Sequence, residues 1–162
     1  MRNLFLLVVM LGLAACGSKF RSYDGPEVTQ LLVVKSERRL YLLHNAEVLK
    51  TYDIGLGFAP SGHKQYEGDG RTPEGMYFID RRNPSSKYHL SVGVSYPNEF
   101  DRALASELGK RPGGDIFIHG RGPSWKKTMP KDWTAGCIAV DDRDIEQIYA
   151  MVQDGTPILI RP

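Results

Sequence analysis

The chain reads DIFIHG over residues 115–120 and DWTAGCIAV over residues 132–140. Each stretch contains a short apolar run, which predicts a buried β-strand. Each predicted strand also carries one reactive side chain at an end, because His119 closes the first and Cys137 opens the second. The loop 121–133 is long enough for the two strands to lie side by side, and this would bring the thiol and the imidazole together.

This pair of side chains is suited to nucleophilic chemistry. A cysteine thiol is a weak nucleophile until a base or a cation lowers its pKa. We expect His119 to serve Cys137 as that base, with the carbonyl of Gly120 orienting the imidazole. Gly136 gives the backbone room to turn, so that the amides of Gly136 and Cys137 would point at one developing oxyanion. The plain alternative is a small buried cysteine and a structural histidine.

The periodicity elsewhere predicts a mainly β domain with a sandwich or barrel-like sheet. Strands this short and close in sequence favour antiparallel hairpins. The long glycine-rich loop 59–75 is either a lid or a disordered insertion. The apolar or alternating runs that predict strands cover 28–35, 40–43, 48–57, 76–80, 89–96, 116–119, 137–140 and 157–160.

Two peripheral helices are predicted. Asn98 can cap the first, which Gly109 would stop, and Asp141 or Asp142 can cap the second, before Gly155. The apolar positions of the first lie on one helical face: Phe100, Leu104 and Leu108. The apolar positions of the second also fit the helical period: Ile145, Ile148, Tyr149 and Val152.

The first residues have the pattern of a lipoprotein signal peptide. A basic start precedes the apolar run 4–13, which is too short to span ~30 Å of hydrocarbon as a helix. The sequence Leu13-Ala14-Ala15-Cys16-Gly17 then resembles the bacterial lipobox, in which the cysteine is lipidated. An ordinary signal peptide with a chance cysteine, or a buried N-terminal helix, is the alternative. We expect a signal peptide at 1–15, a lipidated tether at 16–27 and a folded domain at 28–162.

Composition and charge exclude some classes of function. The 162 residues suit one domain, and a net charge of +2 is too small to indicate a nucleic-acid partner. The four histidines show no paired ligand spacing, so no metal is expected. Lipidation of Cys16 would leave Cys137 as the only thiol, which argues against a structural disulfide.

The two reactive strands resemble the signature of the L,D-transpeptidase catalytic domain (YkuD-type, also called the ErfK/YbiS/YcfS/YnhG group). That signature is a histidine, a spacer, Ser or Thr, one further residue and Gly-Cys. Here 14 residues separate His119 from Thr134-Ala135-Gly136-Cys137. The stretch Thr72-Pro73-Glu74-Gly75-Met76-Tyr77 is similar to the Thr-Pro-x-Gly-x-Tyr stretch of the same family. The resemblance covers 28–161, nearly all of the expected mature chain.

The resemblance implies a mainly β L,D-transpeptidase catalytic domain that acts on peptidoglycan stem peptides. Cys137 would be the nucleophile and His119 the general base, while Gly120 orients the imidazole and Gly136 contributes to the oxyanion hole. Cys137 would form a thioester with the third residue of a tetrapeptide stem, release D-alanine and pass the acyl group to an amine. The resemblance implies no cofactor and no metal.

Two positions depart from the family pattern. Many members carry a histidine just before Gly-Cys, where this chain has Ala135, and an arginine two residues after the cysteine, where it has Ala139. The second departure removes a partner for a substrate carboxylate, and Arg121 or Arg143 would have to replace it. Thr134 is the other candidate for substrate binding.

Three functions therefore stay open. The first is a transpeptidase of cell wall biogenesis and cell shape. The second is a hydrolase on the same acyl-enzyme path, either an L,D-carboxypeptidase or an amidase that releases a wall-bound protein. The third is a non-catalytic wall-binding lipoprotein in which Cys137 belongs to the core. The expected location is periplasmic or extracytoplasmic through a lipid on Cys16, and Gly17 resembles an outer-membrane sorting pattern of diderm bacteria.

Overall fold

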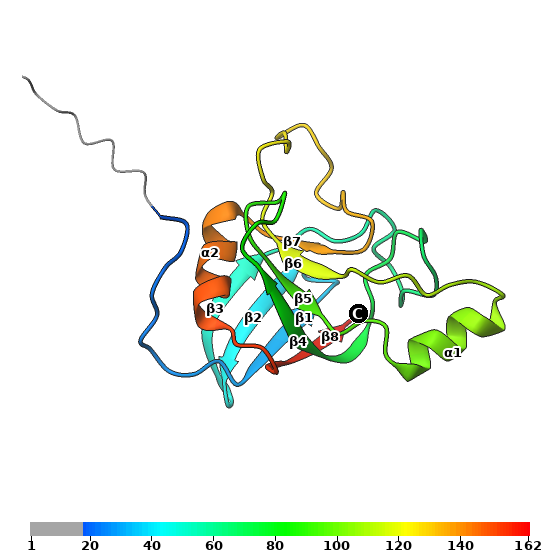
Figure 1. Cartoon of the computed structure of the whole chain (residues 1–162), viewed down its shortest axis with the longest axis horizontal. Helices are drawn as coiled ribbons and strands as arrows, with labels where there is room; N and C mark the ends of the chain where they lie inside the picture. The colour runs from blue at the N-terminus through cyan, green and yellow to red at the C-terminus, as the bar shows by residue number, and fades with distance from the viewer. Residues whose placement is uncertain (1–17) are drawn as a thin grey trace, which may run out of the picture.

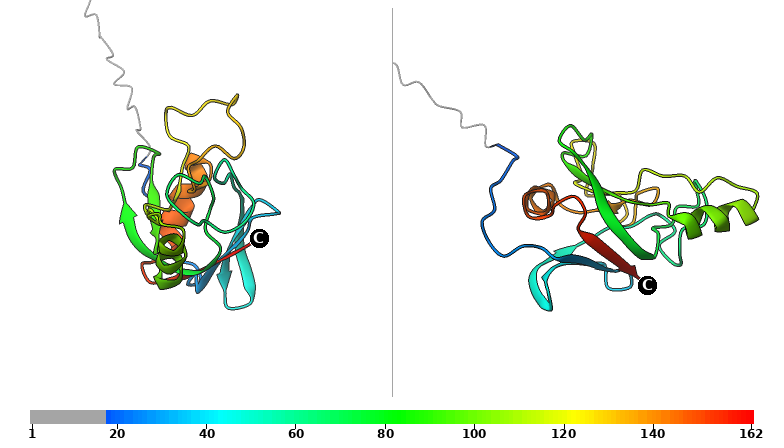
Figure 2. Two further views of the ribbon diagram at one scale, coloured as in Figure 1. Left: turned by 90° about the vertical axis from the view of Figure 1, so that its right-hand side faces the viewer. Right: turned by 60° about the horizontal axis from the view of Figure 1, so that its bottom comes forward.

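The computed structural model describes residues 18–162, so the expected signal peptide and Cys16 lie outside the described residues. The described part contains, in chain order, β1 (Gln30–Val34), β2 (Arg39–His44), β3 (Glu47–Asp53), β4 (Gly75–Asn83), β5 (Ser91–Val94), α1 (Glu99–Glu107), β6 (Phe117–His119), β7 (Ile138–Ala139), α2 (Asp142–Met151) and β8 (Pro157–Arg161). These strands form one sheet in the order β3-β2-β1-β8-β4-β5-β6-β7 (Figure 1). Figure 2 shows that the sheet curls into an open half-barrel. The prediction of a mainly β, barrel-like domain is confirmed.

The strand pairings combine local hairpins with long-range contacts. The pairs β1–β2 and β2–β3 are antiparallel, as predicted for short consecutive strands. The last strand, β8, inserts between β1 and β4, parallel to the first and antiparallel to the second. Alternate residues along these strands are buried, because successive side chains of a strand point to opposite faces. The C-terminal strand therefore joins the opening hairpins to the half of the sheet that carries the reactive residues.

The strands β6 and β7 lie side by side, as the sequence predicts. They pair in parallel, with Ile118 opposite Ile138 and His119 opposite Ala139. A parallel pair needs a crossover connection, and the loop 121–133 supplies most of it. The imidazole at the end of β6 and the thiol just before β7 are thus fixed by backbone pairing.

The helix α2 packs on the sheet through apolar positions that the sequence identifies and, in addition, through Met151. Ile145, Ile148 and Met151 are buried, and Val152 is buried at the C-cap. The helix begins after Asp141, one of the two predicted caps, although the Asp141 side chain makes no capping hydrogen bond. Within the described residues, no helix is long and apolar enough to cross a membrane.

The helix α1 begins as predicted, but its apolar face does not form its main contact with the sheet. Asn98 forms a capping box with Asp101, yet Phe100 is 67% exposed and Leu108 is 47% exposed. Asp101 is buried instead, because its carboxylate accepts hydrogen bonds from the Tyr77 hydroxyl at 3.0 and 3.1 Å. A buried carboxylate needs such partners. The helix is therefore held to the sheet by polar contacts that the hydrophobic period does not show.

The loop 59–75 is packed through two buried lysines. Lys35 donates to the carbonyls of Gly62 and Thr72 at 2.7 and 3.0 Å. Lys64 forms an ion pair of 2.8 Å with Asp69.

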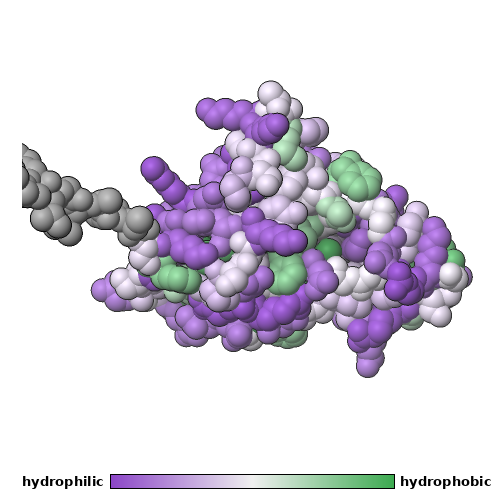
Figure 3. Space-filling model, turned by 45° about the horizontal axis from the view of Figure 1, so that its top comes forward, coloured by the Kyte–Doolittle hydropathy of each residue, from purple (hydrophilic) through white to green (hydrophobic). Residues whose placement is uncertain are grey.

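Hydrophilic side chains cover most of the face shown in Figure 3, where apolar side chains form small separate patches. The apolar side chains of the strands gather in one core inside the curled sheet.

Candidate active site

His119 and Cys137 line the same cavity, which has a volume of about 440 Å³. The end of β6 carries the histidine, and the residue before β7 is the cysteine. The rest of the lining comes from the β4–β5 connection, which includes Tyr88, from the two strand residues that flank it, and from Asp115 and Phe117, just before and at the start of β6. The two residues that the sequence selects are therefore brought together by the fold.

The imidazole of His119 is oriented by its own neighbour in the chain. Its Nδ1 atom lies 2.6 Å from the carbonyl oxygen of Gly120, and the side chain is buried. Since a carbonyl oxygen only accepts hydrogen bonds, Nδ1 carries the proton and Nε2 has the free lone pair. This is the contact that the family resemblance implies for Gly120.

Burial keeps this imidazole neutral. Burial lowers the pKa of His119, and this outweighs the opposing effects of the Gly120 carbonyl and of Asp142. Two aromatic rings hold the imidazole in place. The Tyr88 ring stacks on it with ring centroids 4.4 Å apart, and the Trp133 ring is T-shaped to it with centroids 5.7 Å apart. A neutral, immobilised imidazole with a free Nε2 is ready to accept a proton.

The backbone after His119 is fixed by the first residue of α2. The Oδ1 atom of Asp142 accepts hydrogen bonds from the amides of Arg121 and Gly122 at 2.8 and 3.0 Å. Gly120 sits in this crowded corner, where a Cβ atom would lie 2.5 Å from Asp142 Oδ1 and 2.7 Å from the Tyr88 carbonyl oxygen. A glycine is therefore required at the position whose carbonyl orients the imidazole.

The thiol of Cys137 is half-buried and held by backbone groups. Its Sγ atom donates toward the Asp115 carbonyl oxygen at 3.3 Å and accepts from the Phe117 amide at 3.4 Å. Burial raises the pKa of Cys137, although the Phe117 hydrogen bond acts in the opposite direction. The resting group is thus a thiol, and it needs a base before it can act as a nucleophile.

Thr134 shapes the turn that presents Cys137. Its hydroxyl donates to the Cys137 carbonyl oxygen at 2.7 Å and accepts from the Gly136 amide at 3.2 Å. The side chain is buried, so it lies behind the turn and does not line the cavity. The Gly136 amide is therefore already engaged in this structure, and the Cys137 amide is the remaining expected donor to an oxyanion.

The turn also requires glycine at position 136. Gly136 has a φ of +137°, and a Cβ atom there would lie 2.7 Å from the Arg71 carbonyl oxygen. Both the left-handed φ and the close backbone approach exclude a larger residue. This close approach joins the turn before Cys137 to the end of the loop 59–75.

The candidate arginines lie elsewhere. Arg121 lines a neighbouring cavity of about 470 Å³ with Trp125 and Ala139, and it pairs with Asp141 at 2.7 Å. Arg143 is exposed at the start of α2. The cavity that contains Cys137 and His119 is lined by neither arginine.

A further cavity also reaches Cys137. Its volume is about 320 Å³, and its lining includes Lys64, Glu67 and Ala135. Cys137 and Asp115 line both this cavity and the one that contains His119. The thiol consequently lies where two open spaces meet.

Three residues that position His119 are absent from the sequence prediction. Tyr88 and Trp133 contact the ring, and Asp142 fixes the loop behind it. The aromatic residues are far from His119 in the sequence or lie in its connecting loop, so no local pattern marks them. Asp142 carries a signal only as a residue that can begin a helix.

These observations define a class of protein, a curled mainly β domain with a thiol and an oriented neutral imidazole at one cavity. The chain belongs to the L,D-transpeptidase catalytic domain family (YkuD), whose pattern it matches over residues 29–160. The recognition made from the sequence is confirmed.

Known proteins resemble the chain in sequence and in structure. It is 32% identical to YafK of Escherichia coli (strain K12), a candidate L,D-transpeptidase, over 78% of this chain and 44% of YafK. Pgp2 of Campylobacter jejuni, a helical cell shape determining protein, is 26% identical with a TM-score of 0.63, over 85% of this chain and 49% of Pgp2. Bd1075 of Bdellovibrio bacteriovorus is 27% identical with a TM-score of 0.56, over 83% of this chain and 48% of Bd1075. The chain spans about half the length of these relatives.

Proposed function

We propose that this chain is a peptidoglycan L,D-transpeptidase in which Cys137 forms a thioester with a tetrapeptide stem and transfers it to an amine. One observation supports the proposal above all: Cys137 and an oriented, neutral His119 line one cavity of a domain that belongs to this family. The similarity to Pgp2, a protein that determines cell shape, adds a role in shaping the cell wall to the proposal.

The first half of the proposed reaction is acylation. His119 Nε2 takes the proton of the thiol as Cys137 Sγ attacks the carbonyl carbon of the third stem residue. The Cys137 amide stabilises the oxyanion of the tetrahedral intermediate, a contribution of about 2.7–4 kcal/mol for such a donor. The C–N bond to the terminal D-alanine then breaks, and the imidazolium returns the proton to the leaving amine. A thioester remains.

The second half is transfer. An acceptor amine enters the place that D-alanine left, and neutral His119 removes a proton from it during the attack. The C–S bond breaks, an amide forms and the thiol recovers its proton from the imidazolium. Thioesters favour attack by amines over attack by water more strongly than oxygen esters do. The product is a cross-link between stems or an amide to a protein lysine.

A hydrolase on the same path is the second candidate. The thiol opens into two cavities, of about 440 and 320 Å³, and this gives water two routes to the thioester. Ala135 lines the second cavity, where many family members place a histidine. Attack by water would make the protein an L,D-carboxypeptidase or an amidase that releases a wall-bound protein.

The proposal includes an extracytoplasmic, lipid-anchored location, with peptidoglycan and a membrane as partners. The N-terminal sequence supports this part, because its basic start, apolar run, small residues and Cys16 follow the order of a lipoprotein signal. Metabolic labelling with an azide-bearing fatty acid would test it. Label that depends on Cys16 supports the anchor, whereas equal labelling of wild type and Cys16→Ala contradicts it.

Intact-mass spectrometry with purified tetrapeptide-stem muropeptides tests the chemistry. Wild type is expected to release D-alanine and to gain a covalent adduct, while Cys137→Ala and His119→Gln do neither. A product that requires an added amine would assign a transferase, and a shortened stem without one would assign a hydrolase. Absence of adduct and product in wild type would overturn the proposal. In that case, resistance of Cys137 to alkylation would support the non-catalytic wall-binding alternative.

A further inference from the structure

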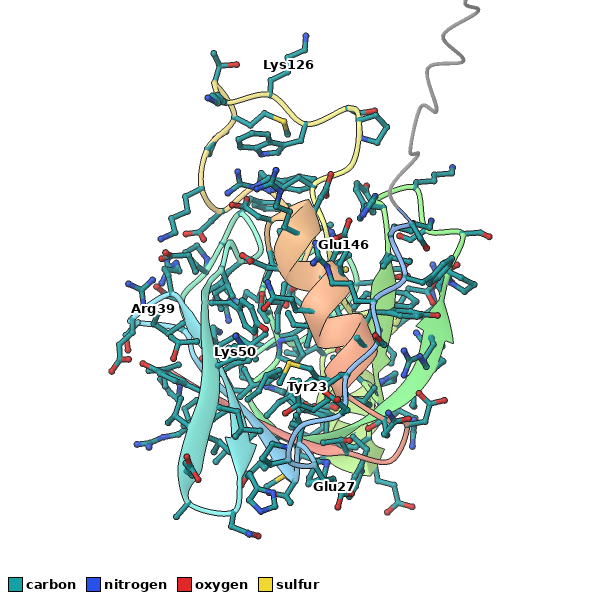
Figure 4. The ribbon with its side chains drawn as sticks, turned by 90° about the vertical axis from the view of Figure 1, so that its left-hand side faces the viewer. Tyr23, Glu27, Arg39, Lys50, Lys126 and Glu146 are labelled. Carbon is teal, nitrogen blue, oxygen red and sulfur yellow. The ribbon has the colours of Figure 1, made fainter. Side chains whose placement is uncertain are left out.

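The segment 18–26, which precedes the sheet, lies against the folded domain. Figure 4 shows this N-terminal segment running along α2, with Glu146 of the helix beside it. Two contacts fasten it there. Arg21 donates from Nη2 and Nε to Glu146 Oε2 at 2.6 and 2.9 Å, and the ring of Phe20 lies 6.1 Å from that of Tyr149. We call residues 18–26 the N-terminal strap.

Lys19 of the strap bridges the connection between β4 and β5. Its ammonium donates to the carbonyl oxygens of Pro84 at 2.7 Å and of His89 at 3.0 Å. These two carbonyls lie near the two ends of the loop 84–90, so one cation closes the loop. An ammonium group has three donors and suits this bridging role.

A second link joins the same loop to the strap through α2. The Nε2 atom of His89 lies 2.9 Å from Glu146 Oε1, and Arg21 occupies the other carboxylate oxygen. Burial alone would raise the pKa of Glu146, but the hydrogen bonds from His89 and Arg21 lower it below its ordinary value. Glu146 therefore stays charged and connects the two basic side chains at neutral pH.

The loop 84–90 in turn positions His119. Tyr88 stacks on the imidazole with ring centroids 4.4 Å apart, and the Leu90 carbonyl oxygen accepts from the Gly120 amide at 3.2 Å. The backbone of Lys87 and Tyr88 also packs directly on the turn after His119, since Cβ atoms added at Gly120 and Gly122 would overlap it. A shift of this loop would move the ring and the carbonyl that orients it.

We propose that the N-terminal strap is a positioning element of the active site, in which Lys19 and Arg21 hold the loop 84–90 so that Tyr88 and the Gly120 turn fix His119. The strap residues do not touch the reacting atoms, and Lys19 is a positioning residue. The proposal rests on the proposed function, because it treats His119 as the general base whose placement matters.

The position of the strap in the chain extends the proposal. Cys16 precedes Lys19 by three residues, and three residues of extended chain reach at most about 11 Å. Under the proposed lipidation, the membrane anchor would thus lie three residues from the strap residue that bridges the loop 84–90. Tension or release at the anchor would then act on the His119 site.

Substitution of Lys19 tests the strap in the full chain, purified in detergent. Lys19→Met keeps the length of the side chain and removes its donors, Lys19→Arg keeps the charge, and Lys50→Met is the matched control on β3. We expect Lys19→Met to lower kcat on muropeptides roughly tenfold with KM nearly unchanged, because a misplaced base slows the chemical step. Lys19→Arg should restore most of the rate, and Lys50→Met should match wild type.

A second readout, without substrate, separates the strap from the proposed function. The imidazole ¹⁵N signals of His119 are expected to shift in Lys19→Met, because the Tyr88 ring current moves with the loop. If wild type is inactive on muropeptides while these signals still shift, the strap stands and the proposed substrate falls. If Lys19→Met equals Lys50→Met in both rate and His119 signals, the strap is overturned.

Discussion

The guanidinium of Arg38 binds Asp132 through both carboxylate oxygens, at distances of 2.7 to 3.1 Å. Asp132 Oδ1 also accepts from the Leu56 amide at 2.9 Å. Arg38 lies in the turn of the first hairpin, and Asp132 lies five residues before Cys137. One ion pair therefore ties the opening β1–β2 hairpin to the segment that carries Cys137.

The first prediction concerns this ion pair. Asp132→Asn is expected to lower the free energy of unfolding by about 1–3 kcal/mol, because a charged, partly buried network loses its charge. Urea unfolding at pH 7 measures the change. Asp53→Asn is the control, since its partner Arg39 and its own carboxylate are well exposed, and it should have little effect. Equal stability of the two variants would contradict the structural role of Asp132.

The contribution of Asp132 to the free energy of unfolding should depend on pH. Burial alone would raise the pKa of Asp132, but the Arg38 and Leu56 hydrogen bonds lower it below its ordinary value. A lowered folded-state pKa means stability that is present above the unfolded-state pKa of about 3.9 and lost as the pH falls through the folded value. The difference between wild type and Asp132→Asn should therefore shrink in acid. A difference that grows below about pH 4 would refute this assignment.

The second prediction concerns Thr134, which the sequence suggests as a substrate contact. Thr134→Val removes the hydroxyl that bonds the Cys137 carbonyl and the Gly136 amide, and it should lower stability by about 1–3 kcal/mol and slow acylation. Thr134→Ser keeps the hydroxyl and should retain most of both. Denaturant unfolding and the rate of D-alanine release are the measurements. If Ser and Val behave alike, the hydroxyl does not shape the turn.

The third prediction concerns Gly136. Gly136→Ala places a Cβ atom 2.7 Å from the backbone oxygen of Arg71 at a φ of +137°, so we expect a destabilised turn and loss of activity. Gly114→Ala is the control, because a Cβ atom there meets nothing within 4 Å and Gly114 has no left-handed φ. Thermal unfolding and acylation rates compare the two. Wild-type activity in Gly136→Ala would show that the turn tolerates a side chain.

Much of the sheet follows from local pattern, whereas its order does not. The hairpins β1–β2 and β2–β3 come from short alternating runs joined by tight turns, and a short window of sequence is enough to recognise such a run. The insertion of β8 between β1 and β4 depends on pairings between residues at least 79 positions apart in the chain. The buried face of α1 cannot be predicted for a different reason. It contains Asp101, whose carboxylate accepts a hydrogen bond from the Tyr77 hydroxyl, and a hydrophobic period does not reveal polar contacts.

The candidate site divides in the same way. His119 and Cys137 can be identified from the sequence because each is a reactive residue at the end of a strand. Gly120 and Gly136 can be identified because Gly120 follows His119 and Gly136 precedes Cys137. Tyr88, Trp133 and the strap act through position alone. Their side chains have no chemistry that marks them as functional. Only the folded chain places Tyr88 and Trp133 against the imidazole and the strap against the loop that carries Tyr88. The roles of the site residues in catalysis stay predictions.

The last prediction concerns the protonation states of the pair. Burial raises the pKa of Cys137 and lowers that of His119, so the resting state at neutral pH is a thiol beside a neutral imidazole. Proton transfer then accompanies the attack on the carbonyl. Acyl transfer should be lost only in acid, with its lower limb below the ordinary histidine pKa of about 6.5, because protonated His119 is no longer a base.

Alkylation of Cys137 by iodoacetamide measures the protonation state of the thiol, because this reaction requires only the thiolate. Its rate should be slow at neutral pH and should rise through a single midpoint above the ordinary thiol pKa of about 8.5. His119→Gln should leave that alkylation profile nearly unchanged while it abolishes acyl transfer, since the histidine is needed as a base during attack and not as a resting counter-ion. A fast alkylation rate that is flat from about pH 5 to pH 8 would instead show a resting thiolate–imidazolium pair, and it would overturn the order of proton transfer proposed for this site.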